Sequence, residues 1–599
     1  MTYARRVLGA LVAVTLVGTL AALAPSADAG APATAAYTKK TLHLKVHVGP
    51  RPSQVCDVVF DLYRPHGVDK KHRAPAVLTT NGFGGSKDDQ ASTAQHLVEQ
   101  GYVVLSYSGL GFGGSSCRIE LDSFAWDGRA AKQLVTFLGG GSAATDGTTV
   151  DYVRRNAHAQ NGKTYDHDPV VGMIGGSYGG GAQLAGAAVD PRIDAIIPII
   201  TWNNLAYSLA PNNATLSGTS LQYTTPGITK ANEHPSSTFG SLAGWLNLLW
   251  FAGTTSTRTE PLPPSTCPNY DQLMCSLHDQ LVTDGYPDAA TLAQFRTNSI
   301  SSRMPHLRAP VLLEQGENDS LFNLQEAVAT YSALRAQQTP VRMVWQSWGH
   351  SGSGDSAAEG PALTEINDNW FRYYLKGEGP APALNFSFYR PWMAATDQPF
   401  ASTDSYPLTG EQTFDLSGTR SFTTPAAGAP TSVTQLVSIR AGTQGMNSVD
   451  VSDPDGTYAS YETPPLSDDL DVVGVPSVTV HVAAPSKELT AGPDGTLGLF
   501  FRIEDIAPDG TVTLPDRLVS AARFPTSDAG QDVTVKLPGI AYRFPAGHTI
   551  RLVIAGSDSA YSLPNPDVSV TIGAPGDHPG VLSLPVASTG SFTDLKVTE

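Results

Sequence analysis

The chain has 599 residues, too many for a single hydrophobic core, so two or three domains are expected. Hydrophobic residues make up 41% of the chain and charged residues 16%, a composition typical of globular rather than disordered proteins. The formal net charge of −17 would repel phosphate backbones and argues against nucleic-acid binding.

The first residues have the layout of a secretory signal peptide. Arg5 and Arg6 precede an apolar run over residues 7–23, and a small-residue cleavage site ends at Ala29. We therefore expect residues 1–29 to be removed during general or twin-arginine export, leaving an extracellular protein without stable membrane association. The alternative is a membrane anchor, but the run is short and no cluster of positive charges follows it.

The chain contains four cysteines: Cys56, Cys117, Cys267 and Cys275. An even number in an exported chain favours disulfides over metal ligation. Cys267 and Cys275 lie close together in a Pro-rich loop, so we predict that they pair and, by elimination, that Cys56 pairs with Cys117. No metal or organic cofactor is expected.

Short apolar strands alternate with helical segments from residue 42 to about residue 377, which predicts an α/β domain with a parallel sheet covered on both faces. The predicted strands are 76–80, 102–107, 170–174, 195–200, 310–314 and 342–345, and the predicted helices are 91–100, 127–138 and 177–188. Pro198 weakens one strand, because a proline cannot donate a hydrogen bond to its neighbour.

A long insertion and a change of pattern divide the rest of the chain. About a hundred residues separate two of these strands, far more than one crossover helix requires. They contain amphipathic stretches, so we expect a helical cap at 203–305, inserted into an α/β-hydrolase domain at 30–202 and 306–380; a separate structural subdomain is the alternative. Residues 381–599 show short alternating strands broken by Gly, Pro and Asp, which favours an all-β jelly roll.

The segment Gly175-Gly176-Ser177-Tyr178-Gly179 fits the G-x-S-x-G pattern of a serine nucleophile. The pattern alone is weak in a glycine-rich chain, but an apolar strand precedes this serine and a small-residue helix follows it. A sharp turn would expose the hydroxyl at the carboxyl edge of the sheet, near the positive end of the helix dipole. We predict that Ser177 is a catalytic nucleophile; a structural turn is the alternative.

A serine nucleophile needs a base, and the base needs an orienting carboxylate. In this kind of sheet both partners should follow later strands, the acid before the histidine. Asp319 and His350 follow the last two predicted strands in that order, which predicts a Ser177–His350–Asp319 triad. Glu317 is the rival acid, because it lies closer to its strand.

An oxyanion hole needs two backbone N–H groups. Tyr178, which follows the nucleophile, would supply one, and Phe83, in the glycine-rich loop 80–86 after an early strand, would supply the other. A merely flexible loop is the alternative. Lys87 follows this loop, but the G-x-x-x-x-G-K-[ST] spacing of a phosphate-binding loop is absent.

These features resemble the Xaa-Pro dipeptidyl-peptidase and cocaine-esterase family of serine hydrolases. The residues that carry the resemblance are Asp61-Leu62-Tyr63-Arg64-Pro65, Gly111-Phe112-Gly113-Gly114-Ser115, the turn at Ser177, Asp319, His350 and Arg502-Ile503-Glu504-Asp505-Ile506-Ala507-Pro508-Asp509-Gly510. The resemblance implies an α/β-hydrolase domain, a cap inserted before the strand that carries the acid, and a C-terminal jelly roll. Some members of that family use a tyrosine hydroxyl in the oxyanion hole, from a Pro-Tyr pair; this chain has Asn81-Gly82-Phe83 there, so a backbone amide would replace it.

The resemblance also implies an enzyme that cleaves amide or ester bonds through an acyl-enzyme, which the signal-peptide pattern predicts to be secreted. The first expectation is an Xaa-Pro dipeptidyl-peptidase-type aminopeptidase acting on peptides, and the alternative is a cocaine-esterase-like hydrolase of carboxylic esters or acylamides. A dipeptidyl specificity requires a cap carboxylate that binds the substrate amine. Glu233, Asp279 and Asp284 are the candidates.

Two further hypotheses rank lower. Asp450, Asp453 and Asp455 could hold calcium, but their spacing misses the EF-hand pattern, and a turn is expected instead. A secreted binding protein whose jelly roll recognises polysaccharide, without catalysis, is the remaining possibility.

Overall fold

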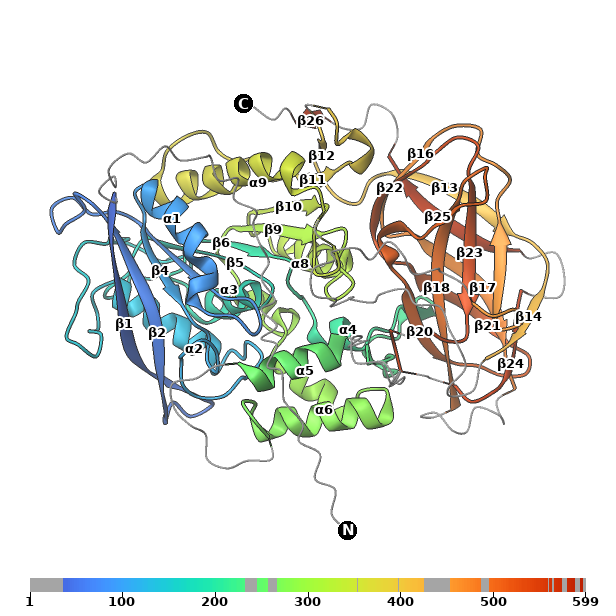
Figure 1. The fold of residues 1–599 in the computed structure, drawn as a ribbon, viewed down its shortest axis with the longest axis horizontal. Coiled ribbons are helices and arrows are strands. Elements are labelled where there is room, and N and C mark those ends of the chain that lie inside the picture. Colours follow the sequence, from blue (N-terminus) through green and yellow to red (C-terminus); the bar gives the residue numbers. More distant parts are fainter. Residues whose placement is uncertain are drawn as a thin grey trace, which may run out of the picture.

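The computed structural model describes residues 36–231, 245–256, 267–352, 354–396, 398–424, 453–485, 495–558, 560–562, 565–573, 579–587 and 593–595. They form an N-terminal α/β domain and a C-terminal all-β domain that lie side by side (Figure 1). The predicted signal peptide, residues 1–29, lies outside the described residues. Within them, no helix has both the length and the apolar character needed to cross a bilayer.

The sheet of the α/β domain has eleven strands in the described part of the chain, in the order β1-β2-β4-β3-β5-β6-β9-β10-β11-β12-β26. Neighbours from β4 to β11 run parallel, as predicted, whereas the strands at both ends are antiparallel. The strands are β1 (Tyr37–Val48), β2 (Gln54–Pro65), β3 (Ala76–Thr80), β4 (Val103–Tyr107), β5 (Val171–Gly176), β6 (Ala195–Ile199), β9 (Val311–Gly316), β10 (Val341–Gln346), β11 (Phe386–Tyr389), β12 (Phe400–Thr403) and β26 (Thr593–Leu595).

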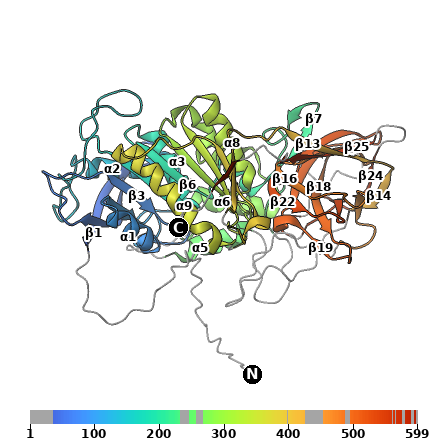
Figure 2. The same cartoon turned by 90° about the horizontal axis from the view of Figure 1, so that it is seen from above.

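Helices cover both faces of this sheet (Figure 2). On one face, α2 (Asp127–Leu138), α3 (Tyr178–Val189) and α8 (Leu324–Ala336) bury one apolar core; on the other, α1 (Ala91–Glu99) and α9 (Ser356–Phe371) bury a second. The three predicted helices correspond to α1, α2 and α3 and are confirmed. Because both faces of the sheet are buried, its central strands are continuous apolar runs. These runs predicted the sheet from the sequence.

Strand β6 forms at the centre of the sheet although it contains Pro198. The amides of Ile196 and Ile200 donate to the carbonyls of Pro310 (3.0 Å) and Glu314 (2.8 Å) on or beside β9. Pro198 lies between these two amides, on the same side of the strand, and cannot donate. The proline therefore removes one rung from the β6–β9 ladder, and the strand tolerates it because its other edge pairs continuously with β5.

The insertion between β6 and β9 contains four α-helices in its described part. Its helices are α4 (Leu205–Leu209), α5 (Trp245–Thr255), α6 (Gln272–Asp284) and α7 (Ala289–Thr297). It also contains a short hairpin, β7 (Ala214–Leu216) and β8 (Thr219–Ser220), and β7 pairs with a strand of the all-β domain. The insertion is thus fastened to the second domain by backbone hydrogen bonds, which a pattern of apolar residues does not reveal.

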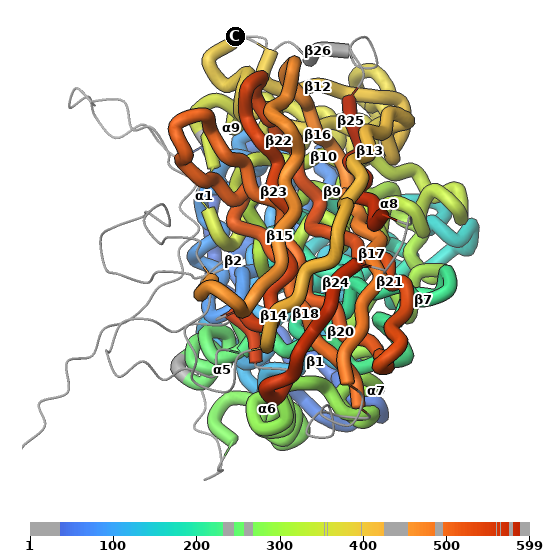
Figure 3. Tube along the Cα trace, turned by 90° about the vertical axis from the view of Figure 1, so that its right-hand side faces the viewer, coloured from blue at the N-terminus to red at the C-terminus, as the bar shows by residue number. Residues whose placement is uncertain are grey.

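The all-β domain is a sandwich of two antiparallel sheets, whose strands overlap in the view of Figure 3. One apolar core lies between the sheets. The first sheet contains β13 (Gly410–Leu416), β14 (Arg420–Thr423), β16 (Leu470–Gly474), β17 (Ser477–Ala483), β21 (Gln531–Lys536), β22 (Ile540–Phe544), β24 (Ser569–Ile572) and β25 (Gly580–Val586). The second contains β15 (Tyr458–Glu462), β18 (Thr496–Ile506), β19 (Val512–Thr513), β20 (Ser520–Pro525) and β23 (Thr549–Ala555). Gly510, at φ 87°, completes the predicted turn between β18 and β19.

The predicted boundary between the two domains lies between residues 380 and 381. Strands β11 and β12, which lie beyond that boundary, continue the sheet of the α/β domain. Their alternating pattern reads like the jelly roll, but Phe386 of β11 packs edge-on against Trp345 of β10, with ring centroids 4.7 Å apart. We therefore propose that the all-β domain begins after β12. Strand β26 returns the chain to the first sheet by pairing with β12.

Disulfides link Cys56 to Cys117 and Cys267 to Cys275. The first joins β2 to the loop after β4, and its cysteines are 61 residues apart in sequence. The second ties α6 to the segment before it across a separation of 8 residues. The two bonds therefore restrict loops of very different length in the unfolded chain.

Two buried acids, Glu120 and Asp122, lie in the loop before α2, and a third, Asp127, is the first residue of that helix. Glu120 and Asp122 are 6% and 2% exposed, and burial raises the pKa of both, that of Glu120 to about 9. Burial also raises the pKa of Asp127 to about 7. The amide of Asp122 donates to the hydroxyl of Tyr178 (3.0 Å), so this group lies behind the turn at Ser177. Protonated carboxyls are favoured here because no solvent stabilises their charge.

The two disulfides should stabilise the protein unequally. The loop-entropy relation gives about 4 kcal/mol for the long loop and about 2.5 kcal/mol for the short one. We expect Cys56→Ala with Cys117→Ala to lower the free energy of unfolding more than Cys267→Ala with Cys275→Ala. Urea denaturation of both double variants measures the difference, and a larger loss for the Cys267–Cys275 pair would contradict it.

Ionisation of Glu120 should make stability fall with rising pH. The unfolded chain loses this proton near pH 4.5 and the folded chain near pH 9, so folding becomes less favourable between those values. Glu120→Gln cannot ionise, so its melting temperature relative to that of the unchanged protein should be higher at pH 8 than at pH 5. Thermal melts of both proteins at both pH values test this, and a difference independent of pH would count against it.

Candidate active site

Ser177 lies in the sharp turn between β5 and α3. Its backbone has φ 55° and ψ −119°, a conformation that residues with a side chain rarely adopt. Its amide donates to the carbonyl of Ile199 on β6 (2.9 Å), and its carbonyl accepts the amides of Gly180 and Gly181 in the first turn of α3 (2.9 and 3.1 Å). These bonds on both sides hold the strained turn in place.

Gly179 shows why small residues surround the serine. A Cβ atom at this position would lie 2.6 Å from the carbonyl oxygen of Thr80 on β3. The start of α3 therefore approaches the neighbouring strand more closely than any side chain permits. The sequence G-x-S-x-G satisfies this packing requirement as well as the backbone conformation of the serine.

The three residues of the predicted triad come together at the carboxyl edge of the sheet. The Oγ of Ser177 lies 2.8 Å from Nε2 of His350, and Nδ1 of His350 lies 2.6 Å from Oδ2 of Asp319. These separations are hydrogen bonds, although the residues are 173 and 31 positions apart in the chain. The loops after β5, β9 and β10 meet because their strands are parallel and end at the same edge.

The carboxylate of Asp319 is fully buried and held in one orientation. Its Oδ1 accepts the amides of Leu321 (3.0 Å) and Phe322 (2.7 Å), and its Oδ2 accepts the amide of His350 (3.3 Å) besides the imidazole. The rival acid, Glu317, is 1% exposed, and its carboxyl group has no hydrogen-bond partner among the described residues. The structure thus brings Asp319, and not Glu317, to the imidazole.

Two aromatic rings meet the imidazole of His350 edge-on. The Phe322 ring centroid lies 5.1 Å from it, and that of Trp245, at the start of α5, lies 5.8 Å from it. Only 11% of the His350 side chain is exposed. The insertion therefore takes part in keeping water away from the histidine, because α5 supplies one of the two rings.

The loop after β3 passes beside the serine. A Cβ atom on Gly82 would lie 4.0 Å from the Cβ of Ser177. The carbonyl of Gly82 accepts hydrogen bonds from the side chain of Asn81 (2.7 Å) and the amide of Gly85 (3.1 Å). Because a peptide's carbonyl and N–H point in opposite directions, these bonds also fix the direction of the Phe83 amide.

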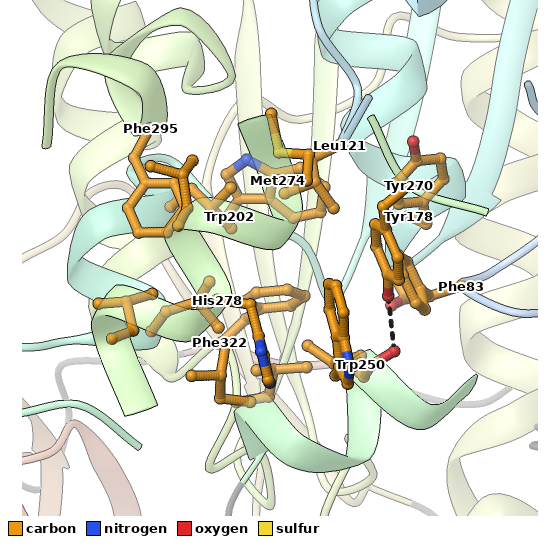
Figure 4. Close-up of a pocket in the computed structure, with 18 residues that line it drawn as sticks. Phe83, Leu121, Tyr178, Trp202, Trp250, Tyr270, Met274, His278, Phe295 and Phe322 are labelled. Atoms are coloured by element: carbon orange, nitrogen blue, oxygen red, sulfur yellow. Dashed lines mark hydrogen bonds between the residues drawn. The ribbon is translucent and has the colours of Figure 1, made fainter. Parts of the chain in front are cut away.

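A cavity of about 80 Å³ adjoins Ser177 (Figure 4). Phe83 and Tyr178 line one side, while the cap contributes side chains from α5, α6 and α7. Trp250 of α5 stacks between Tyr270 and His278, with ring centroids 4.5 and 4.0 Å away. Most of the lining is aromatic or aliphatic, so the cavity suits an apolar group.

None of the side chains that line this cavity is a carboxylate. Asp279 and Asp284, two of the predicted amine-binding residues, lie on α6 with exposed side chains. The third, Glu233, lies outside the described residues. In the described part of the chain, therefore, nothing acidic faces the cavity to bind a substrate amine.

The predicted calcium-binding aspartates have other surroundings. Asp453 and Arg502 are both buried and form an ion pair (2.5 Å), Asp455 lies in a turn, and Asp450 lies outside the described residues. Across the described ranges, no group of three or more His, Cys, Asp or Glu side chains is arranged to hold a metal ion.

Two family models match the sequence. The model of the X-Pro dipeptidyl-peptidase (S15 family) matches residues 56–352, and that of the X-Pro dipeptidyl-peptidase C-terminal non-catalytic domain matches residues 389–576. Together they cover most of the α/β domain with its insertion and most of the all-β domain. No curated protein sequence matches the chain.

Solved structures of hydrolases share the whole architecture. An aminopeptidase from a marine sediment archaeon, Thaumarchaeota archaeon, is 14% identical with a TM-score of 0.62, covering 94% of this chain and 99% of that one. An alpha-amino acid ester hydrolase is 16% identical with a TM-score of 0.61, covering 94% and 98%. A CocE/NonD family hydrolase from Staphylococcus aureus is 12% identical with a TM-score of 0.57, covering 92% and 96%.

At these identities the likeness establishes a common fold across both domains. The two family models add a match at the level of sequence. The catalytic-domain model matches first along the chain, and the C-terminal-domain model follows it. The chain belongs to the X-Pro dipeptidyl-peptidase family (S15 family) of hydrolases.

Proposed function

We propose that this protein is a secreted serine hydrolase that works through an acyl-enzyme on Ser177. The observation that carries the proposal is the continuous hydrogen-bonded chain from the Ser177 hydroxyl through His350 to the buried carboxylate of Asp319. In such a chain, a neutral imidazole can take up a proton at one nitrogen, while the carboxylate accepts a hydrogen bond from the N–H group at the other nitrogen.

In the first step, Nε2 of His350 removes the hydroxyl proton as Oγ of Ser177 attacks the carbonyl carbon of the substrate. The C–O bond forms, and the carbonyl oxygen becomes an oxyanion. The protonated His350 then gives its proton to the leaving amine or alcohol, and the bond to that group breaks. Asp319 holds the imidazole tautomer and stabilises its charged form throughout.

The amides of Tyr178 and Phe83 would stabilise the oxyanion. Tyr178 begins α3, where the first N–H groups of the helix point toward the turn, and the Phe83 amide is fixed by the bonds to the Gly82 carbonyl. Water then attacks the acyl-enzyme with the help of His350, and Ser177 regains its proton as the acid product leaves.

Family membership supports peptides with an N-terminal Xaa-Pro unit as the first substrate class, and a proline ring suits an apolar cavity. Esters or acylamides with an apolar acyl group are the second class. They are favoured by the cavity's described lining, which has no carboxylate for a substrate amine, because a buried ammonium without a partner is costly.

Several features support secretion. The N-terminal residues carry the signal-peptide pattern, and the described residues contain two disulfides, which persist in oxidising compartments. The acidic charge suits a soluble extracellular protein.

A fluorophosphonate probe should label the protein at one site. We expect rapid labelling of the unchanged protein and none of Ser177→Ala, because the probe reacts only with an activated serine. Ser115→Ala, which removes another buried serine of the same domain, serves as the control and should still be labelled. Labelling that persists in Ser177→Ala would contradict the proposed nucleophile.

A comparison of Gly-Pro p-nitroanilide with p-nitrophenyl acetate and butyrate would separate the two substrate classes. We expect turnover of at least one of them, abolished in Ser177→Ala. Exclusive turnover of the esters would remove the peptidase assignment, whereas preference for the anilide would support it.

The backbone role of Phe83 can be tested by removing its N–H. Phe83→Pro lacks the donor and should lower kcat by about 10²–10³. Phe83→Ala keeps the N–H and loses the ring, which lines the cavity and packs against Phe112, Tyr178 and Tyr270. Its KM should therefore rise, while its loss of kcat should be much smaller. Steady-state kinetics with thermal melts of both variants measure this, and equal losses would argue against an amide donor at this position.

A further inference from the structure

Lys230 is a buried lysine of the insertion that takes no part in the mechanism described above. It is 3% exposed, and its backbone joins two parts of the cap: its amide donates to the carbonyl of Leu209 (2.8 Å), and its carbonyl accepts the amide of Leu246 (3.1 Å). Its ammonium group points at the loop after β9. There it donates to the carbonyls of Ser320 (2.7 Å) and Leu321 (3.0 Å).

These two carbonyls belong to the peptide groups that hold the triad acid. The peptide between Ser320 and Leu321 offers its oxygen to Lys230 and its N–H to Asp319 (3.0 Å). The next peptide, between Leu321 and Phe322, does the same, with an N–H bond of 2.7 Å to the same oxygen of Asp319. Two consecutive peptides are thus each clamped between an ammonium and a carboxylate.

The direction of both peptide dipoles strengthens this arrangement. In each peptide the negative oxygen faces the cation, and the positive N–H faces the anion, so the two charges polarise the same bonds in the same sense. Asp319 is fully buried and would be costly to ionise without such compensation. Burial lowers the pKa of Lys230 to about 8, and attraction to Asp319 and Glu326 opposes that shift, so most of the lysine is charged at pH 7.

Resting on the function proposed above, we propose that Lys230 is a positioning residue for the catalytic triad. Its buried ammonium orients the two peptides that hold Asp319 and places a positive charge on the far side of them from this carboxylate. Because Lys230 belongs to the insertion, the part of the chain that lines the substrate cavity also supplies the positive charge next to the loop of Asp319.

Other charged groups face this region, and no variant replaces them. Glu326 of α8 accepts the amides of Asn203 (2.7 Å) and Asn204 (3.0 Å), and Glu359 of α9 accepts the amide of Ser347 in the loop before His350 (2.8 Å). Glu317 lies two residues before Asp319 without a hydrogen-bond partner in the described structure. Burial raises the pKa of Glu326 and the charge of Lys230 opposes this shift, so removal of that charge also favours the neutral form of Glu326, which partly offsets the shift expected at the triad.

The test is the pH dependence of kcat/KM in Lys230→Met, which removes the charge while keeping a side chain of similar length. Loss of a nearby positive charge favours proton uptake by the triad as a whole, so the acid limb of the profile should move up by about half a pH unit or more. We also expect kcat to fall about tenfold or more, with a smaller change in KM, because the acid loses its fixed orientation. Loosened packing alone would lower kcat without moving the limb.

Lys230→Arg keeps the charge but changes the donor geometry, so its acid limb should stay where it is in the unchanged protein while kcat falls. Lys376→Met is the matched control: this lysine also donates to a backbone carbonyl, that of Gln100 (2.6 Å), on a surface far from the triad loops, and should leave both readouts unchanged. Thermal melts report the folding of each variant. If Lys230→Met does not fold, Lys230→Arg carries the test alone.

An unmoved acid limb in folded Lys230→Met, or a limb in Lys230→Arg that moves up by half a pH unit, would overturn this inference. Failure of the unchanged protein to hydrolyse any substrate would instead overturn the proposed function. The two failures are therefore distinguishable in one set of measurements.

Discussion

The whole site depends on one strained turn that the surrounding backbone holds in place. Ser177 keeps its unusual conformation because β6 binds its amide and the first turn of α3 binds its carbonyl, while Gly179 lets the helix approach β3. A serine in a relaxed turn would not meet an imidazole delivered from the loop after β10. The parallel sheet matters for function because it brings three distant loops to a single edge.

The insertion and the second domain complete what the sheet begins. The insertion lines the cavity, places Trp245 against His350 and buries Lys230 behind the acid. Strand β7 fastens the insertion to the all-β domain, whose own core is separate. None of the described residues that line the cavity comes from the all-β domain. This domain therefore contacts the site indirectly, through the insertion that pairs with it.

Much of this was predictable from local patterns, and the remainder depends on contacts between distant residues. The central strands were visible because both faces of the sheet are buried, the helices α1, α2 and α3 were visible from their spacing of apolar and small residues, and the glycines beside Ser177 mark its turn. Strands β1 and β2 were not predicted, because polar residues interrupt their apolar ones: β1 alternates buried Leu44 and Val46 with exposed residues, and β2 carries Asp57 and Asp61. The β7–β8 hairpin is too short to leave a pattern, and nothing near Lys230 in sequence indicates that it reaches the loop of Asp319.

The most direct test of the central claim is a crystal structure of the protein after reaction with a phosphonate inhibitor. The account predicts a covalent bond to Oγ of Ser177, with one phosphonyl oxygen within hydrogen-bond distance of the amides of Tyr178 and Phe83. A phosphonyl group on any other residue, or one whose oxygens point away from both amides, would contradict it.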